Sequence, residues 1–304
     1  MKKIYLLFIL FVGLSSYAQQ DAQYTQYMYN TMSVNPAYAG SRGVLSITAL
    51  HRSQWVGLEG APSTQTFNIN SPISDRIGLG LSVVADKIGP TTENVIDGMF
   101  SYTIETSLQG KLSFGVKGGI NILNIDYDRL SRYQNEPTML NNDMRSNIAP
   151  NIGAGLYFHD DKFYAGLSVP NILETKYFDD ASFSVAKEKI NLYFISGYVF
   201  DLNPSFKFKP TVLVKAVVGA PLQLDLSANF IYNDKLTIGV AHRLDAAWSA
   251  MAGFNATDSI LLGFAYDRES TELGNTKFND GSFEFIARFE LFNRFNKLLT
   301  PRHF

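Results

Sequence analysis

The sequence contains no cysteine, which excludes disulfide bonds, thiolate metal sites, a cysteine nucleophile and a lipid-modified N-terminal cysteine. It also has no excess of either charge. The 26 basic and 28 acidic side chains give a net charge of −2, so nothing favours binding to nucleic acid. Charged residues are only 18% of the chain and aromatic residues are 13%, a composition that excludes a disordered protein.

Beyond the N-terminus, the sequence lacks any apolar run that approaches the roughly 18 residues of a membrane-spanning helix. The N-terminus itself has the pattern of a secretory signal peptide. The basic start Met1–Lys3 precedes an almost wholly apolar stretch, Ile4–Leu14, and small residues flank Tyr17. This pattern predicts a signal peptide over residues 1–18 with cleavage after Ala18, although a buried N-terminal helix is the alternative.

From Gly43 onward the hydrophobic pattern has a period of two, which is typical of strands with one apolar and one polar face. In residues 77–86, for example, Ile77, Leu79 and Leu81 alternate with Gly78, Gly80 and Ser82. About fourteen segments of this kind are present. They span residues 43–52, 63–71, 76–86, 94–105, 111–124, 149–158, 162–169, 190–200, 206–216, 222–231, 235–243, 247–255, 259–267 and 282–292.

The connections between these segments mostly alternate between short and long, with residues 87–93, 125–148 and 170–189 among the long ones. We therefore expect an all-β fold: a transmembrane antiparallel β-barrel over residues 43–292, with short periplasmic turns and longer extracellular loops. An even number of strands would return both termini to the periplasm, including a C-terminal tail over residues 293–304. A soluble β-sandwich is the alternative, because its strands alternate too.

Every second residue of a strand lies on its polar face, and we call this set of positions the polar parity. It carries many glycines and charges. The glycines are Gly78, Gly80, Gly115, Gly119, Gly153, Gly155, Gly166, Gly197, Gly239, Gly253 and Gly263. They either relieve crowding in the wall or make room in the lumen for the N-terminal segment, for the loop 125–148 or for a partner's segment. Charges of both signs on this parity are expected to pair inside a polar lumen, where Ser82→Arg should cost much less than Leu81→Arg on the lipid-facing parity.

The sequence contains few signs of catalysis. Its four histidines, His51, His159, His242 and His303, form no HExxH motif or other paired-ligand spacing. His242, Asp245 and Ser249 are close in sequence, but strand parity does not bring them together. We therefore expect no enzymatic activity, no catalytic residue, no metal site and no cofactor.

Residues 19–60 carry the most distinctive pattern. A segment over residues 19–42 is rich in tyrosine and has no strand period, and a turn-forming Asn-Pro pair precedes the first strand. This segment is predicted to be either a plug that packs under the barrel or a docking site for a periplasmic partner. The candidate partner-binding residues are Tyr24, Tyr27, Asn35, Pro36, Tyr38, Gly40, Arg52, Gln54 and Trp55.

Several motifs resemble the PorP/SprF family of outer-membrane proteins associated with the type IX secretion system. They are NPAYAGSRG at residues 35–43, R-x-QWVGLEGAP at residues 52–62, DKIGP at residues 86–90, GLSVPNIL at residues 166–173, KPTVLVK at residues 209–215, the run at residues 221–243, the strand at residues 263–267 and the last four residues, 301–304. One departure is Ser282-Phe283-Glu284, where the family pattern has a His-Glu pair.

The resemblance implies an outer-membrane barrel that works with components of the type IX apparatus. Such a barrel would assist the secretion or surface attachment of a large secreted protein with a C-terminal sorting domain, such as a gliding adhesin, or would link the apparatus to its periplasmic ring. The alternative is a porin or a barrel that transports hydrophobic molecules. Outer-membrane lipid is the expected surrounding in either case.

Overall fold

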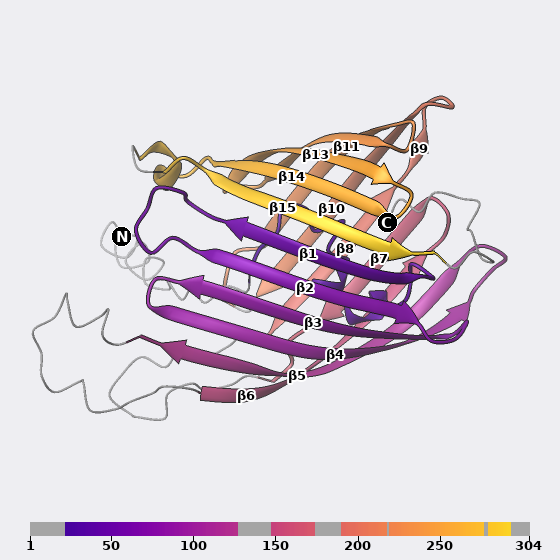
Figure 1. Ribbon diagram of the computed structural model, residues 1–304, viewed down its shortest axis with the longest axis horizontal. Helices are drawn as coiled ribbons and strands as arrows, with labels where there is room; N and C mark the ends of the chain where they lie inside the picture. Colours follow the sequence, from indigo (N-terminus) through magenta and orange to yellow (C-terminus); the bar gives the residue numbers. More distant parts are fainter. Residues whose placement is uncertain (1–21, 127–146, 174–189, 218, 277–278, 293–304) are drawn as a thin grey trace, which may run out of the picture.

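One antiparallel sheet closes on itself to form a barrel (Figure 1). The structure is a computed structural model, and it describes residues 22–126, 147–173, 190–217, 219–276 and 279–292. The last strand, β15, pairs with the first, β1, and β10 pairs with β11, so the ring of hydrogen bonds is complete. This closure confirms the all-β, antiparallel barrel that the period of two predicts. The predicted signal peptide and the C-terminal tail lie outside the described residues.

The strands are β1 (Leu45–Ser53), β2 (Ser63–Pro72), β3 (Ile77–Ile88), β4 (Thr91–Glu105), β5 (Lys111–Ile125), β6 (Asn147–His159), β7 (Phe163–Val169), β8 (Asn191–Tyr198), β9 (Phe200–Asp201), β10 (Phe206–Val217), β11 (Gln223–Tyr232), β12 (Leu236–Arg243), β13 (Ala247–Thr257), β14 (Ile260–Glu269) and β15 (Ser282–Leu291). The short 3-10 helices η1 (Thr31–Ser33), η2 (Pro36–Tyr38) and η3 (Glu272–Asn275) lie outside the strands. Only Val199 separates β8 from β9, and both pair with β10 in one register, so they form a single wall strand and the barrel has fourteen.

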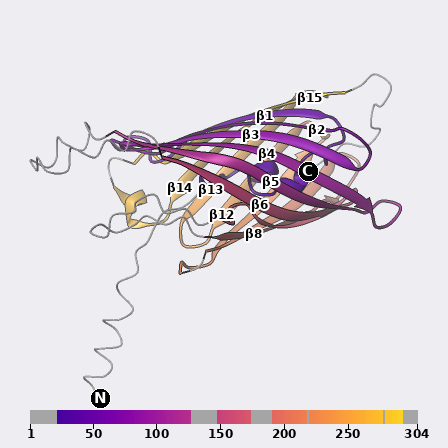
Figure 2. The same cartoon turned by 90° about the horizontal axis from the view of Figure 1, so that it is seen from below.

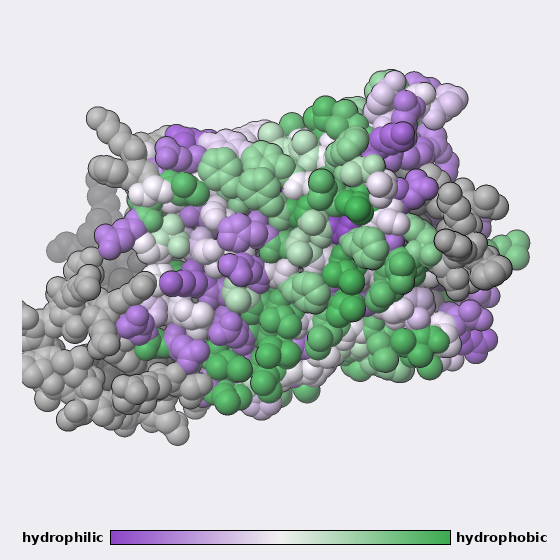
Figure 3. All heavy atoms as spheres, in the orientation of Figure 1, coloured by the Kyte–Doolittle hydropathy of each residue, from purple (hydrophilic) through white to green (hydrophobic). Residues whose placement is uncertain are grey.

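The two faces of the wall differ as the sequence predicts. On β3, Leu79 and Leu81 point outward and are each 44% exposed, whereas Gly78 is buried and Ser82 is only 2% exposed on the inner face. Apolar side chains cover the middle of the outer wall, and polar ones gather toward one end of it (Figure 3). An apolar outer band around a polar interior is the arrangement that a bilayer requires of a barrel.

Charged side chains on the polar parity are buried inside the barrel, and many of them pair. Lys117 on β5 lies 2.6 Å from Asp97 on β4, and Arg243 on β12 lies 2.9 Å from Asp225 on β11. The other buried charged residues of the strands are Arg52, Lys209, Lys215, Asp267, Glu284, Arg288 and Glu290. The expectation that charges of mixed sign pair inside the lumen is therefore confirmed.

Aromatic side chains mark both edges of the apolar band. At one edge, Tyr198 packs against Phe200 with ring centroids 4.5 Å apart, and Phe206 packs against Tyr232 at 4.8 Å. At the other edge, His242 and Trp248 stack at 4.0 Å. Such girdles lie at the two interfaces between bilayer and water in barrels of the outer-membrane type.

The connections define two ends of the barrel. At the short-turn end they are residues 73–76, 106–110, 160–162, 202–205, 233–235 and 258–259, and at the long-loop end they are residues 54–62, 89–90, 126–146, 170–190, 218–222, 244–246 and 270–281. The expected long connection over residues 87–93 is instead a two-residue turn. Gly89 adopts a φ of 56°, which permits this tight turn and lets β3 and β4 continue farther than predicted.

The two described ends of the chain lie at opposite ends of the barrel. β15 runs toward the short-turn end, where the expectation places both termini. Gln23, in contrast, donates a hydrogen bond to Gln223, the first residue of β11, at the long-loop end. The period of two places strands in the wall, but it carries no information about the direction in which a segment without that period crosses the lumen.

Candidate functional site

Residues 22–44, which we name the plug, run through the lumen from the long-loop end to the short-turn end (Figures 1 and 2). Near its beginning, Gln23 Nε2 lies 3.0 Å from Gln223 Oε1. Near its end, Arg42 Nη2 donates to Glu290 Oε2 at 3.1 Å, close to the C-terminal end of β15. The plug therefore continues into β1 at the short-turn end, and its beginning reaches the long-loop mouth of the barrel.

A buried network of charges holds the beginning of the plug. Glu284 accepts hydrogen bonds from the backbone N–H groups of Thr25 and Gln26 at 2.9 and 2.8 Å. The hydroxyl of Thr25 donates to Asp267 at 2.7 Å. Arg52 completes the network, because its guanidinium lies 2.7 Å from Asp267 and 3.1 Å from Glu284. Hydrogen bonds to ionised groups are the strong ones, so this network fixes the plug to β1, β14 and β15.

Two candidate tyrosines of the plug bond to opposite sides of the wall. The hydroxyl of Tyr24 lies 2.8 Å from Oγ1 of Thr66 on β2. The hydroxyl of Tyr27 lies 2.8 Å from Oγ1 of Thr211 on β10. Both rings are buried, at 6% and 2% exposure. These side chains therefore span the width of the lumen and are not available at the surface.

The helix η2 packs against the part of the wall formed by β4, β5 and β6. Asn35 caps it, because its side chain accepts a hydrogen bond from the N–H of Ala37 at 3.0 Å, and Pro36 follows at the first helical position. The amide of Asn35 also donates to the carbonyl of Leu156 on β6 at 2.9 Å. A Cβ atom at Gly115 would overlap the main chain of Ala37, so the close approach of η2 to β5 requires this glycine.

The end of the plug makes equally close contacts. Tyr38 meets Tyr157 edge to face, with ring centroids 5.3 Å apart. Gly40 has a φ of 73°, and its N–H donates to Asn70 on β2 at 3.1 Å. A Cβ atom at Gly40 would lie only 2.7 Å from the Cα of Gly78. Both glycines are therefore needed where the plug turns toward β1.

The inner glycines serve both of the purposes that the sequence leaves open. Those that make room for the plug are Gly78, Gly80, Gly115, Gly155, Gly166 and Gly263. Those that relieve crowding within the wall itself are Gly119, Gly153, Gly197 and Gly239. Of the three occupants considered for the lumen, the structure shows the N-terminal segment against this glycine-lined wall.

The lumen is packed where the plug crosses it. A cavity between the plug and the wall, lined by Tyr29, Asn68 and Arg288 among others, has a volume of only about 10 Å³. That volume admits roughly one water molecule. At this cavity, the plug and the wall therefore leave space for no larger solute.

Two candidate residues lie at the long-loop end and not in the lumen. The N–H of Gln54 donates to the carbonyl of Pro62 at 2.9 Å, which closes the loop over residues 54–62. The N–H of Trp55 donates to Ser282 Oγ at 3.2 Å, and Ser282 Oγ donates in turn to Glu269 at 2.8 Å. Both side chains of the loop are half-buried. Ser282 therefore connects this loop to β14 and β15.

The structure separates the candidate residues into two groups. Tyr24, Tyr27, Asn35, Pro36, Tyr38, Gly40 and Arg52 lie in the lumen, whereas Gln54 and Trp55 lie at its long-loop mouth. Sequence reasoning did not include Asp267 and Glu284 among the site residues, although both are charged residues on the polar parity of a strand. That parity was the signal that identified them as lumenal. A role in partner binding remains a prediction for the whole set.

Among the described residues, no group of three histidine, aspartate or glutamate side chains is arranged to hold a metal ion. Within the same residues, no helix has both the length and the apolar character needed to cross a membrane.

Comparison with known proteins gives one family and a set of similar barrels. A family model described as "Type IX secretion system membrane protein PorP/SprF" matches residues 16–289. The hydrocarbon channel CymD superposes with a TM-score of 0.52 at 10% identity, over 87% of this chain and 93% of that one. Omp33 of Acinetobacter baumannii gives 0.48 at 9% identity, over 82% and 100% of the two chains, and the KdgM porin gives 0.39 at 11%, over 81% and 99%. No curated protein matches the chain.

Proposed function

Because the chain belongs to the PorP/SprF family of type IX secretion system membrane proteins, we propose that it assists the secretion or surface attachment of a cognate large secreted protein, such as a gliding adhesin. The chain is a barrel of the outer membrane, so it is placed where such a protein leaves the cell. A C-terminal sorting domain on the secreted protein is part of this proposal.

The observation that carries the proposal is the packed lumen. The plug fills the barrel with side chains that are bonded to the wall, from Thr25 at one mouth to Arg42 at the other. This packing supports a barrel that presents surfaces to a partner over a barrel that conducts solutes. The partner-binding surface is then formed at the ends of the barrel.

The long-loop end is the proposed surface for the secreted protein. The loop over residues 54–62 carries the half-buried Trp55 and the exposed Gly57 and Glu59. Beneath it, Arg52 joins the first strand to the buried network that holds Thr25. Of the lumenal candidates, Tyr24, Tyr27 and Arg52 therefore act on partner binding by fixing the beginning of the plug under this loop. Trp55 supplies an aromatic contact of the kind enriched at binding hot spots.

Two variants test this assignment in cells that secrete the partner. Deletion of residues 20–33 should leave a folded, heat-modifiable barrel that no longer retains the secreted protein at the surface, as measured by surface labelling. Trp55→Ala should weaken retention, whereas Glu59→Ala in the same loop should not. Unchanged retention together with new ion conductance in planar bilayers would show that the segment only seals the barrel, and the docking assignment would then be wrong.

A link between the apparatus and its periplasmic ring is the second candidate role. Apolar side chains stand exposed in three connections of the short-turn end: Ile73 at 62%, Leu108 at 107% and Leu202 at 57%. Each of these side chains offers apolar surface that contact with another protein would bury. Leu108→Asp should reduce co-purification of the other type IX components, with Gln109→Asp as the control in the same turn. Equal co-purification of the two variants would remove support for this role.

A further inference from the structure

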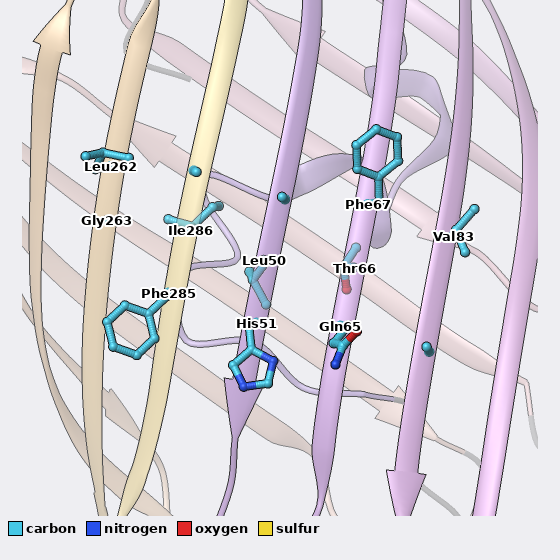
Figure 4. A pocket seen from close by; sticks show the side chains of 13 residues that line it. Leu50, His51, Gln65, Thr66, Phe67, Val83, Leu262, Gly263, Phe285 and Ile286 are labelled. Carbon is cyan, nitrogen blue, oxygen red and sulfur yellow. The ribbon is translucent and has the colours of Figure 1, made fainter.

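A groove on the outer wall carries an inference that does not depend on the secreted partner. The groove crosses β14, β15, β1, β2 and β3 and has a volume of about 580 Å³ (Figure 4). Its apolar lining includes Phe67, Val83, Leu262 and Phe285. This volume lies within the roughly 300–1,000 Å³ typical of sites for small molecules. These four residues lie on the outward parity of the strands, so the groove opens toward the bilayer. Its lining also includes the inward-parity residues Leu50, Thr66, Gly263 and Ile286.

The register of the strands explains why the wall is hollow here. Ala287 on β15 pairs with Ala49 on β1, and Ala49 pairs with Phe67 on β2. Two alanines thus lie side by side in a row of the outer face, where neighbouring positions carry large side chains. Phe67, at 45% exposure, stands at one side of the alanine pair, and Leu262, at 49%, lies at the other, as the register partner of Ala287. Small residues form the floor of the groove, and these two large apolar residues form its walls.

The groove has one apolar end and one polar end. Toward the short-turn end it is lined by Leu262 and Phe67, and toward the long-loop end by the polar His51 and Gln65 beside Phe285 (Figure 4). His51 and Gln65 are register partners, and His51 Nε2 lies 3.1 Å from Ser53 Oγ. The exposed Lys87 lies on β3 two residues beyond Ala85, the partner of Gln65, within reach of the same polar end.

We propose that this groove is a specific binding site for a membrane lipid with a phosphate-bearing headgroup. One acyl chain lies over Ala49 and Ala287, between Phe67 and Leu262, and the headgroup lies against His51, Gln65 and Lys87. The groove and the lipid have the same polarity. The hydrophilic end of the groove points toward the long-loop end, as the headgroup of a lipid in the leaflet at that end does.

Two features of the wall favour a lipid as the occupant. The groove opens on the apolar band of a membrane barrel, where hydrocarbon chains surround the protein from all sides. Its polar end also carries a cation, Lys87, and hydrogen-bonding side chains in neighbouring positions. Cations close to the membrane surface attract anionic headgroups, and a purely apolar protein contact would leave His51 and Gln65 facing apolar atoms.

Native mass spectrometry of the full barrel in detergent tests the proposal. The probes are phosphatidylglycerol and a diacylglycerol with the same acyl chains but no phosphate. The wild-type protein should bind one phosphatidylglycerol tightly and the diacylglycerol about tenfold more weakly. Ala49→Trp should fill the groove and lower the affinity for both probes by about tenfold. The control is Ala154→Trp, which places the same side chain on the outward face of β6, beyond the groove, and should change neither affinity.

The headgroup contacts are tested separately by Lys87→Ala combined with Gln65→Ala. This variant should lose most of the preference for phosphatidylglycerol and bind diacylglycerol as the wild type does. Heat-modifiable migration verifies that every variant forms the barrel. The proposal is overturned if Ala49→Trp and Ala154→Trp bind phosphatidylglycerol equally. It is also overturned if Ala49→Trp leaves lipid binding intact and instead prevents co-purification of a second membrane protein, since the groove would then be a protein interface.

Discussion

Arg52 and Glu284 are register partners across the junction of the first and last strands, and their side chains meet inside the barrel at 3.1 Å. They are 232 residues apart in the sequence. Glu284 also accepts the backbone N–H groups of Thr25 and Gln26. One buried carboxylate therefore connects barrel closure to plug binding.

Removal of this carboxylate should be the most damaging single change. Glu284→Ala leaves the guanidinium of Arg52 with Asp267 as its one remaining carboxylate of this network, and it leaves two backbone N–H groups of the plug without their acceptor. Breaking a buried charge pair from one side costs about 3–5 kcal/mol. Urea unfolding in detergent should show a loss of this size. Asp161→Asn, in an exposed turn, is the control and should change the free energy of unfolding by less than about 0.5 kcal/mol.

Two glycines of β5 give a matched pair for the packing of the plug. Gly115→Ala places a methyl group against the main chain of Ala37, whereas Gly118→Ala points to the outer face, where no atom lies within 4 Å. Overpacking of this kind costs about 1–3 kcal/mol. Limited proteolysis should cut the plug faster in the first variant and at the wild-type rate in the second. Equal rates would show that η2 can shift away from the wall without making the plug more accessible to the protease.

Asn35 should contribute through both of its hydrogen bonds. Asn35→Ala removes the cap of η2 and leaves the carbonyl of Leu156 without this donor. The expected loss is about 1–3 kcal/mol, which combines a lost cap with a lost buried hydrogen bond. Thermal unfolding monitored by migration on unboiled gels measures it. The outward-facing Asn124→Ala serves as the control, and a loss in that variant as large as in Asn35→Ala would contradict the assignment.

The free-energy cost of a charged side chain on the outer wall should depend on its depth in the bilayer. Leu81→Arg introduces a cation into the apolar band, at a cost of about 2–4 kcal/mol if the side chain lies near the midplane. Asn94→Arg on the neighbouring strand has the same outward parity but lies in the polar part of the wall, and should cost about 0–1 kcal/mol. Equilibrium unfolding in lipid vesicles compares the two. A similar cost at both positions would contradict the position of the band.

The sequence predicts the wall well, because the side-chain period of a strand reports which face each residue occupies. Leu81 points outward and Ser82 inward, as expected. The expectation that Ser82→Arg would be well tolerated does not follow from the structure. Ser82 is 2% exposed in a lumen that the plug fills, so an arginine there has no room. Parity distinguishes a polar face from an apolar one, but it does not show whether that face is hydrated or packed.

The plug could be recognised from the sequence only as a segment without a period. Its position depends on contacts between residues far apart in the chain, such as Thr25 with Asp267, which are separated by 242 residues. Local patterns carry no information about such pairs. The same limit applies to the outer groove, because the adjacency of Ala49 and Ala287 exists only once β1 and β15 have paired. The strand pattern identifies the charged residues that hold the plug as lumenal, but it does not identify the plug residues that they contact.

The continuity of the plug with β1 also constrains the order in which this barrel can assemble. β1 is the first of these strands to be synthesised. It pairs on one side with β2 and on the other with β15, which is the last. The plug contacts both strands, because Thr25 bonds with Arg52 on β1 and with Glu284 on β15. The beginning of the plug can therefore complete its contacts only once β15 is present, and contacts of such high sequence separation make folding slow. A barrel of this design is a ring that closes around its own leading segment.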